Sequence, residues 1–343
     1  MDINRIKDDL SAKLHNLPWQ KLLAKYQNPQ RAKSIWQLVN TLIPYVFLWY
    51  IMYLSLSVSY WLTLALAIPA AGFLVRIFII FHDCGHGSFF KSKKWSDFWG
   101  FVTSILVFTP YDYWRHEHAQ HHAAAGNLDD RGFGDIWTLT VKEYLKASRW
   151  TRIKYRFARN PICLFIIGPA ILFLVVHRLP RKDAGPKGTR GIYVTNVALV
   201  AAITAMCFWI GWKAYLLIQL PVLLMAASSG VWLFYVQHQF EGVYWERKEG
   251  WDYVDEAIKG SSFYKLPKVL QWFTGNIGFH HIHHLCPRIP NYFLEKCYKE
   301  IPLLQQIKPI TFLASFKSMT FRLWDEQHQR LVGFGYLKTL KHA

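Results

Sequence analysis

The chain has 343 residues, of which 52% are apolar and 17% aromatic, and its formal net charge is +18. Its apolar content argues against two ordinary soluble domains, although the length would allow them. The positive charge comes without a nucleic-acid recognition motif. We therefore attribute it to cytoplasmic loops near anionic lipid headgroups and expect no nucleic-acid partner. Five cysteines without a CxxC pair or regular spacing exclude a disulfide framework and a zinc ribbon.

In chain order, a polar segment at residues 1–34 lacks the apolar core of a signal peptide and is predicted to be cytoplasmic. Residues 35–57 and 59–81 are apolar and long enough to cross a bilayer, which needs about 20 residues in a helix. Residues 192–210 and 214–236 qualify as well. Each pair is joined by a very short connection, so the sequence predicts two transmembrane hairpins.

Histidines gather directly after these apolar stretches. Eleven of the fifteen lie in four clusters: HDCGH at 82–86, HEHAQHH at 116–122, the single His238, and HHIHH at 280–284. In a helix, residues spaced i, i+3 and i+4 share one face. That spacing selects eight candidate metal ligands, and His238 joins them because it follows the fourth span by two residues. The nine candidates are His82, His86, His118, His121, His122, His238, His280, His283 and His284.

The remaining histidines receive other predictions. His116 and His281 interleave with the triplets but point off their face, so we expect them to support the ligands or to face solvent. Four isolated histidines are expected to be structural: His15, His177, His328 and His342.

Two further apolar stretches are predicted not to cross the membrane. Residues 99–110 are too short and are expected at the interface. Residues 161–177 carry basic residues on both flanks, which places both ends on the cytoplasmic side. If the histidines form one site, the number of crossings between His122 and His238 must be even. Residues 161–177 are therefore predicted to lie in the membrane plane or to re-enter.

The fold class that follows is an all-α integral membrane protein. It has four transmembrane helices in two hairpins, interfacial helices, and a cytoplasmic helical cap that carries the histidines. The predicted organisation is a cytoplasmic segment at 1–34, a membrane domain at 35–310 and a cytoplasmic C-terminal segment at 311–343. Arg76 falls within the second span near its cytoplasmic end, and we expect it to snorkel toward the interface.

Nine imidazoles exceed the needs of one metal, whereas two metals with four or five nitrogens each would leave positions open for oxygen or water. Imidazole suits zinc, copper, iron and nickel alike. The spacing from His116 to His121 is HExxxH rather than the HExxH of zinc proteases, and a structural zinc site needs only four ligands. Iron fits redox chemistry on an inert substrate.

Four motifs resemble those of the membrane-bound fatty acid desaturases. They are HDCGHGSFF (82–90), HEHAQHH (116–122), HQFEGVYW (238–245) and GNIGFHHIHHLCPRIPNY (275–292). The resemblance covers about residues 35–310 and looks closest to bacterial and cyanobacterial acyl-lipid desaturases of the omega-6 (delta-12) or delta-5 type. It implies a di-iron centre with the nine histidines as ligands, which uses O2 to introduce a cis double bond into a fatty acyl chain.

The resemblance also implies partners and a location. The chain lacks the HPGG haem motif of desaturases fused to cytochrome b5, which implies an external electron donor such as ferredoxin. The substrate would be a membrane lipid or an acyl carrier, and the location a bacterial inner membrane with the site on its cytoplasmic face. Some relatives add an Asn ligand four residues before the lone histidine, where this chain has Phe234. Asn276 is a substitute on position alone.

Two other functions remain open at this stage. A related di-iron hydroxylase or ketolase would use the same histidines on a lipid or carotenoid. A histidine-rich metal transporter would place its ligands near the bilayer midplane, whereas all nine candidates follow the spans, which disfavours transport.

Overall fold

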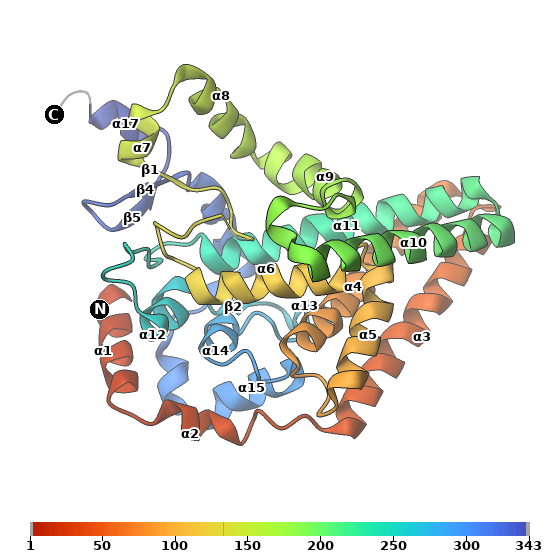
Figure 1. The fold of residues 1–343 in the computed structure, drawn as a ribbon, viewed down its shortest axis with the longest axis horizontal. Helices are drawn as coiled ribbons and strands as arrows, with labels where there is room; N and C mark the ends of the chain where they lie inside the picture. Colours follow the sequence, from red (N-terminus) through yellow and green to blue (C-terminus); the bar gives the residue numbers. More distant parts are fainter. Residues whose placement is uncertain (1–2, 133, 341–343) are drawn as a thin grey trace.

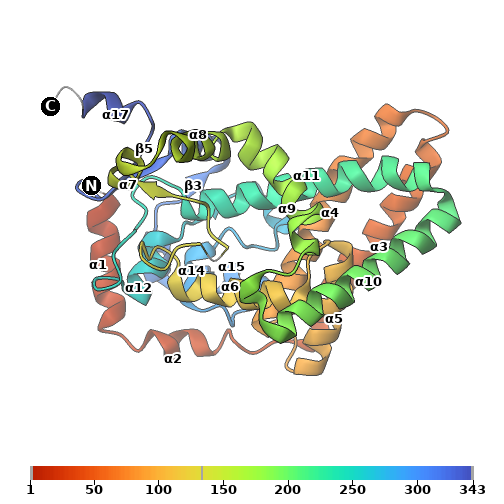
Figure 2. The same cartoon turned by 45° about the horizontal axis from the view of Figure 1, so that its top comes forward.

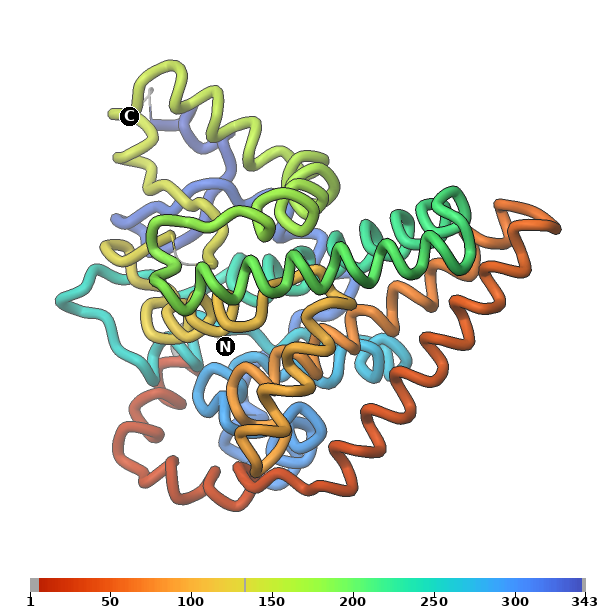
Figure 3. The backbone as a smooth tube through the Cα atoms, turned by 45° about the vertical axis from the view of Figure 1, so that its right-hand side comes forward, coloured from red at the N-terminus to blue at the C-terminus, as the bar shows by residue number. Residues whose placement is uncertain are grey.

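The computed structural model describes residues 3–132 and 134–340. Within these residues four helices are long and apolar enough to cross a membrane: α3 (Arg31–Ser55), α4 (Tyr60–His86), α10 (Gly185–Ile210) and α11 (Trp212–His238). They form two hairpins that extend from one side of a broad cap (Figures 1 and 3). The prediction of four spans in two hairpins is confirmed, and the protein is a membrane protein.

The two hairpins pack together through α4, which contacts α3, α5 and α11. Small residues on α4 are buried at this junction, among them Ala67, Ala70 and Ala71. Small side chains let helices approach closely where lipid offers no hydrophobic driving force. Large side chains near the far tips of the hairpins instead face outward, including Trp61 and Phe208, which are 81% and 89% exposed.

The cap consists of short elements. The other α-helices are α1 (Ile3–His15), α2 (Trp19–Ala24), α5 (Lys93–Leu106), α6 (Tyr111–Ala124), α7 (Val141–Lys146), α8 (Arg149–Ala158), α9 (Gly168–Leu174), α12 (Tyr253–Asp255), α13 (Lys268–Phe273), α14 (His280–Leu285), α15 (Asn291–Glu300), α16 (Phe312–Ser315) and α17 (Tyr336–Thr339). Tighter or wider helical turns are η1 (Cys163–Ile167), η2 (Val176–Arg178), η3 (Lys182–Ala184), η4 (Glu256–Gly260), η5 (Pro302–Gln306) and η6 (Phe316–Thr320).

Short strands depart from the all-α prediction. They are β1 (Leu139–Thr140), β2 (Tyr264–Lys265), β3 (Ile310–Thr311), β4 (Leu323–Asp325) and β5 (Arg330–Val332). They form one sheet in the order β1-β4-β5 and a two-stranded parallel pair, β2-β3. These strands attach the C-terminal residues to the cap, where Trp324 is fully buried. Strands of two or three residues are too short to leave a periodic sequence pattern, which explains why they were not predicted.

The segment from α8 to η2 starts and ends against the cap. A bend of 66° separates α8 from the following helical stretch, and α9 lies against α11 (Figure 2). At the start, the Arg159 guanidinium donates to Gln239 Oε1 at 2.9 Å. At the end, Arg181 lies 3.3 Å from the Glu117 carboxylate on α6. Both ends of this segment therefore contact the histidine-bearing cap, as expected if residues 161–177 return to the side of the membrane from which they start.

Residues 99–110 fall mainly on α5, which packs against α4. This helix has 14 residues, so its length of about 21 Å is too short to cross a bilayer.

The prediction for Arg76 is wrong. Its side chain does not reach for the interface but is buried, with a relative exposure of 7%. Its Nε donates to Thr41 Oγ1 at 3.1 Å, and its Nη1 donates to the Trp272 carbonyl. The guanidinium also lies 3.9 Å from the Trp272 ring centroid. A buried cation within a span requires such partners, and here they join α4 to α3 and α13.

If residues 161–177 do not cross the membrane, the two ends of this segment can be labelled from the same side. Single cysteines at the exposed positions Asn160 and Lys182 should react with a membrane-impermeant maleimide from the same side of the membrane. A cysteine at Ser57, in the turn between α3 and α4, should react only from the other side. The background would carry Cys163→Ala and Cys207→Ala. Labelling of positions 160 and 182 from opposite sides would contradict the re-entrant reading.

Candidate metal centre

Four segments far apart in sequence bring the nine candidate histidines together. His82 and His86 lie at the end of α4, and His238 lies at the end of α11. The two triplets lie on α6 and α14. A first group contains His82, His86, His118, His122 and His283, whose ring nitrogens lie within 4.8 Å of one another, and a second group contains His121, His238 and His284 on the same criterion.

His280 joins the second group through His238. Its Nε2 lies 3.0 Å from His238 Nε2, and His238 Nε2 lies 3.2 Å from His121 Nε2. A single N–H on His238 could bridge only one of these neighbours. Two imidazole nitrogens bound at right angles to one metal, each at about 2.1 Å, would lie about 3 Å apart. The spacing therefore fits nitrogens that share a metal ion.

The first group repeats this spacing. His122 Nε2 lies 3.2 Å from His118 Nε2 and 3.0 Å from His283 Nε2. Among the described residues, His86 Nε2 and His284 Nε2 are buried without a hydrogen-bond partner. Such orphaned nitrogens are costly unless another group satisfies them, and a metal ion would do so.

Burial keeps the cap histidines in the form that binds metal. Desolvation, followed by repulsion from neighbouring imidazoles, lowers the pKa well below its usual range for His118, His122, His280, His283 and His284. A neutral imidazole offers a ring-nitrogen lone pair, whereas a protonated one has none. These five side chains therefore offer lone pairs to a metal rather than positive charges.

Three carboxylates contact candidate ligand rings at the nitrogen that does not face the other histidines. Each faces the Nδ1 of a histidine: Asp83 with His82 at 3.1 Å, Asp135 with His121 at 2.8 Å, and Glu256 with His284 at 3.0 Å. A carboxylate at Nδ1 fixes the tautomer and directs Nε2 toward the metal. Sequence analysis missed all three carboxylates. Two of them lie far from the histidine clusters along the chain, so no local spacing marks them.

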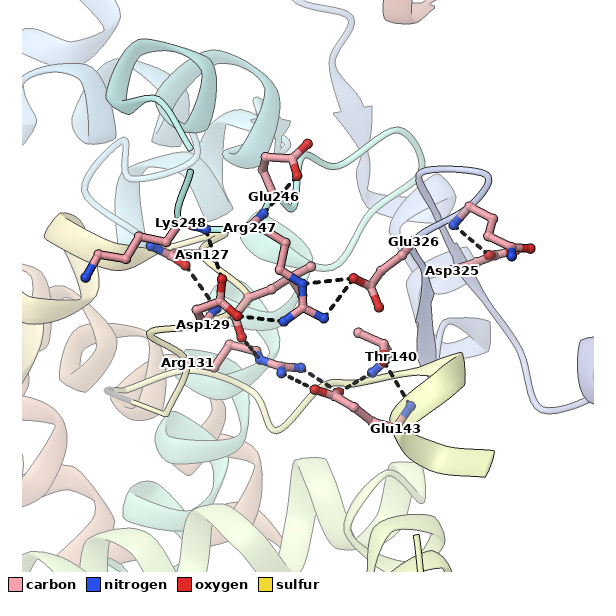
Figure 4. Close-up of polar contacts among 12 residues, drawn as sticks. Asn127, Asp129, Arg131, Thr140, Glu143, Glu246, Arg247, Lys248, Asp325 and Glu326 are labelled. Atoms are coloured by element: carbon pink, nitrogen blue, oxygen red, sulfur yellow. Dashed lines mark hydrogen bonds and ion pairs between the residues drawn. The ribbon is translucent and has the colours of Figure 1, made fainter. Parts of the chain in front are cut away.

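Ion pairs anchor the loop that carries Asp135, between α6 and β1 (Figure 4). Before Asp135, Arg247 donates to Asp129 at 2.6 Å, and Arg131 donates to Glu143 Oε2 at 3.0 Å. Glu143 belongs to the capping box of α7. These contacts fix the loop to two other parts of the cap, so the carboxylate of Asp135 is held against its histidine.

The other histidines lie outside both groups. His116 is exposed, whereas His281 is fully buried next to the rings of Phe263 and Tyr298 and so does not face solvent. Of the isolated histidines, His177 packs on Phe173 and His328 lies 2.8 Å from Asp325. His15 lies 3.2 Å from Asp252, and His342 is outside the described residues.

Comparison with known proteins identifies the family. Residues 59–307 match the model of the fatty acid desaturase family. The chain is 52% identical over 318 residues to a fatty acid desaturase from Bacillus subtilis, covering 93% of this chain and 90% of the relative. The chain belongs to the fatty acid desaturase family. It is an oxidoreductase, and its buried histidine groups are consistent with a di-iron site.

More distant relatives include plant and cyanobacterial desaturases. The chain is 27% identical over 266 residues to an endoplasmic-reticulum omega-3 fatty acid desaturase from Vigna radiata, covering 71% of this chain and 66% of the relative. It is 26% identical over 246 residues to the sn-1 acyl-lipid omega-3 desaturase (ferredoxin) from Synechocystis, covering 68% of this chain and 64% of the relative.

A cavity of about 680 Å³ reaches the histidines of the desaturase. This volume lies within the range of roughly 300–1,000 Å³ that is usual for ligand sites. Its walls come from α4, α6, α9 and α11 and are mainly apolar, including Leu74, Phe78, Ile171, Leu223 and Leu233. Its lining also includes four of the candidate ligands: His82, His118, His121 and His280. The cavity is thus a mainly apolar space bordered in part by the metal-binding groups.

The structure offers no tenth metal ligand at either of the two positions considered, Phe234 and Asn276. Phe234 lines the cavity, and its ring centroid lies 5.1 Å from that of His121 and 5.0 Å from that of His238. It therefore presents an apolar wall to the second group. Asn276 is not a substitute, because its Oδ1 accepts from Gln271 at 2.8 Å and its Nδ2 donates to the Asn291 carbonyl at 3.1 Å.

The role of Asp135 generates a prediction. Asp135→Ala frees the Nδ1 of His121 and should lower desaturase activity and metal affinity by about 10- to 100-fold, as loss of a ligand-orienting carboxylate does elsewhere. The matched control is Asp130→Ala, which removes an exposed carboxylate from the same loop and should leave both nearly unchanged. Metal content and product would be measured for both variants. Equal effects would show that the loss arises from the loop as a whole.

Proposed function

We propose that the two histidine groups bind two iron ions and that the chain uses O2 to desaturate a fatty acyl chain. His82, His86, His118, His122 and His283 would hold one iron, and His121, His238, His280 and His284 the other. The observation that carries the proposal is that four of these nine imidazoles line the apolar cavity. No other side-chain chemistry is needed there, because an alkyl chain offers no acid, base or leaving group.

When bound, the iron pair would supply the activation of O2. The overall reaction removes two hydrogens from adjacent carbons, forms a cis C=C bond and reduces O2 to two waters with two electrons and two protons from outside. This chain's residues would bind the alkyl chain between α4 and α11, exclude water and fix the carbons that react. Phe234 would hold the chain against the second group at the end of the cavity.

The proposal extends to the substrate and the electron donor. The substrate would be an acyl chain on a membrane lipid, of the omega-6 (delta-12) or delta-5 class. Support comes from relatives whose names specify acyl-lipid substrates, such as the sn-1 oleoyl-lipid 12-desaturase from Anabaena variabilis, which is 27% identical over 270 residues. Ferredoxin would be the electron donor, as in the name of the Synechocystis relative.

The bacterial inner membrane, with the centre on its cytoplasmic face, would be the location, given the Bacillus subtilis relative and the basic residues beside the cap. Residues 35–310 would form the membrane domain between two cytoplasmic segments. Hydroxylation or ketolation by the same centre would appear as an oxygenated product. Transport is disfavoured because the histidine groups lie at the cap ends of α4 and α11 rather than within the spans.

Two ligand variants and one control test the proposal. His121→Ala and His283→Ala, one from each group, should abolish the unsaturated product and lower bound iron. His328→Ala removes a half-exposed imidazole from the C-terminal segment and should leave both unchanged. Each variant would be expressed in a host that lacks polyunsaturated fatty acids, with fatty-acid profiling and iron analysis. Normal product and full iron content in either ligand variant would refute the site assignment.

A further inference from the structure

One edge of the histidine centre approaches the surface away from the cavity. Seven of the nine histidines are buried, none more than 8% exposed, whereas His86 and His118 are half-buried. Among the described residues, the cavity lining includes His118 but not His86. Gly87, which ends α4 beside His86, is exposed, and a Cβ there would meet nothing within 4 Å. The first group is therefore closest to solvent at His86.

Basic residues lie on the chain segments next to this edge: the loop after His86, the starts of α3 and α5, and α6. We call them the basic corner: Lys33, Lys91, Lys93, Lys94 and Arg115. Arg115 lies beside the residue before His86, with its Cγ 3.9 Å from the position that a Cβ on Gly85 would take. The four lysines are exposed.

Contacts join the parts of the corner that are distant in sequence. Ser34 Oγ donates to the Phe89 carbonyl at 2.6 Å, which places the start of α3 against the loop before α5. Asp97 accepts from Arg115 at 2.9 Å and pairs with Lys93. Arg115 also lies 3.4 Å from the Asp112 carboxylate, so five cations face two carboxylates and the corner keeps an excess of positive charge.

We infer that the basic corner is the docking surface for an acidic one-electron carrier protein of the ferredoxin class, which delivers electrons at His86. This inference rests on the proposed function. Each turnover needs two electrons from outside, supplied by two reduced carriers in succession, and together with two from the C–H bonds they reduce O2 to two waters. A carrier must bring its redox centre close to the irons without blocking the cavity, and His86 meets both conditions.

Charge complementarity selects a protein partner of this kind. A surface with five cations and two carboxylates, Asp97 and Asp112, keeps a positive excess. It attracts an acidic carrier and speeds its encounter, by a factor that falls as salt rises. Anionic lipid headgroups would also be attracted, but lipid binding gives no reason for the cations to gather at the half-buried ligand. Trp114, stacked on His118 with ring centroids 4.4 Å apart, lines the opposite, cavity side of the same group.

The test compares two triple variants of the full-length enzyme in lipid nanodiscs. K91Q/K93Q/K94Q neutralises the corner, and K142Q/K146Q/K154Q removes the same charge from exposed positions on α7 and α8. Reduced plant-type [2Fe–2S] ferredoxin is the donor, and product is measured against its concentration. We expect the corner variant to raise KM for ferredoxin about tenfold with kcat unchanged and a weaker salt dependence, and the control to match the wild type.

Two further measurements separate the alternatives. A single turnover after reduction with dithionite, without ferredoxin, should give equal product in all three proteins, and wild-type failure there would overturn the proposed function together with the docking surface. An unchanged KM in the corner variant, or an equal rise in the control, would overturn the docking surface alone. A KM difference that vanishes in phosphatidylcholine discs and returns with added phosphatidylglycerol would assign the corner to lipid headgroups.

Discussion

Nine imidazoles gather in one small volume of this desaturase, and the rest of the structure depends on how their lost hydration is replaced. Desolvation lowers the pKa of the cap histidines, so they do not repel one another as cations. Their ring nitrogens then approach to about 3 Å in pairs that N–H bonds alone do not satisfy, such as the three that meet at His238. Two metal ions would satisfy these nitrogens and join four separate segments.

The fold brings the four histidine-bearing segments together on the same side of the spans. α4 and α11 end in ligands, α6 packs against α4, and the histidines of α14 meet those of α11 and α6. The segment from α8 to η2 must return to the same side, because a crossing there would separate His121 from His238. By returning, it also supplies a wall of the cavity through η1 and α9. Topology and substrate space are therefore two consequences of one requirement, that the ligands share one face of the membrane.

Local patterns in the sequence were sufficient for the spans and for eight of the nine candidate ligands, because apolar length and i, i+3, i+4 spacing act within a single helix. His238 was predicted only from its position just after a span. Long-range contacts were beyond them. Arg76 was expected to snorkel, but its partner, the Trp272 carbonyl, lies 196 residues away. Asp135 and Glu256 carry no local mark of their role, since each meets its histidine only after the cap has folded. Asn276 seemed available by position, and only its contacts show that both ends of its amide are used.

The central claim is that the two groups bind two iron ions through nitrogen-rich ligation. Purified protein from cells grown with ⁵⁷Fe would test it most directly, by metal analysis combined with Mössbauer spectroscopy. The account predicts two irons per chain, in high-spin sites that lose signal when a histidine of either group is replaced. Zinc in place of iron, or a single iron that survives the loss of every histidine in one group, would contradict it.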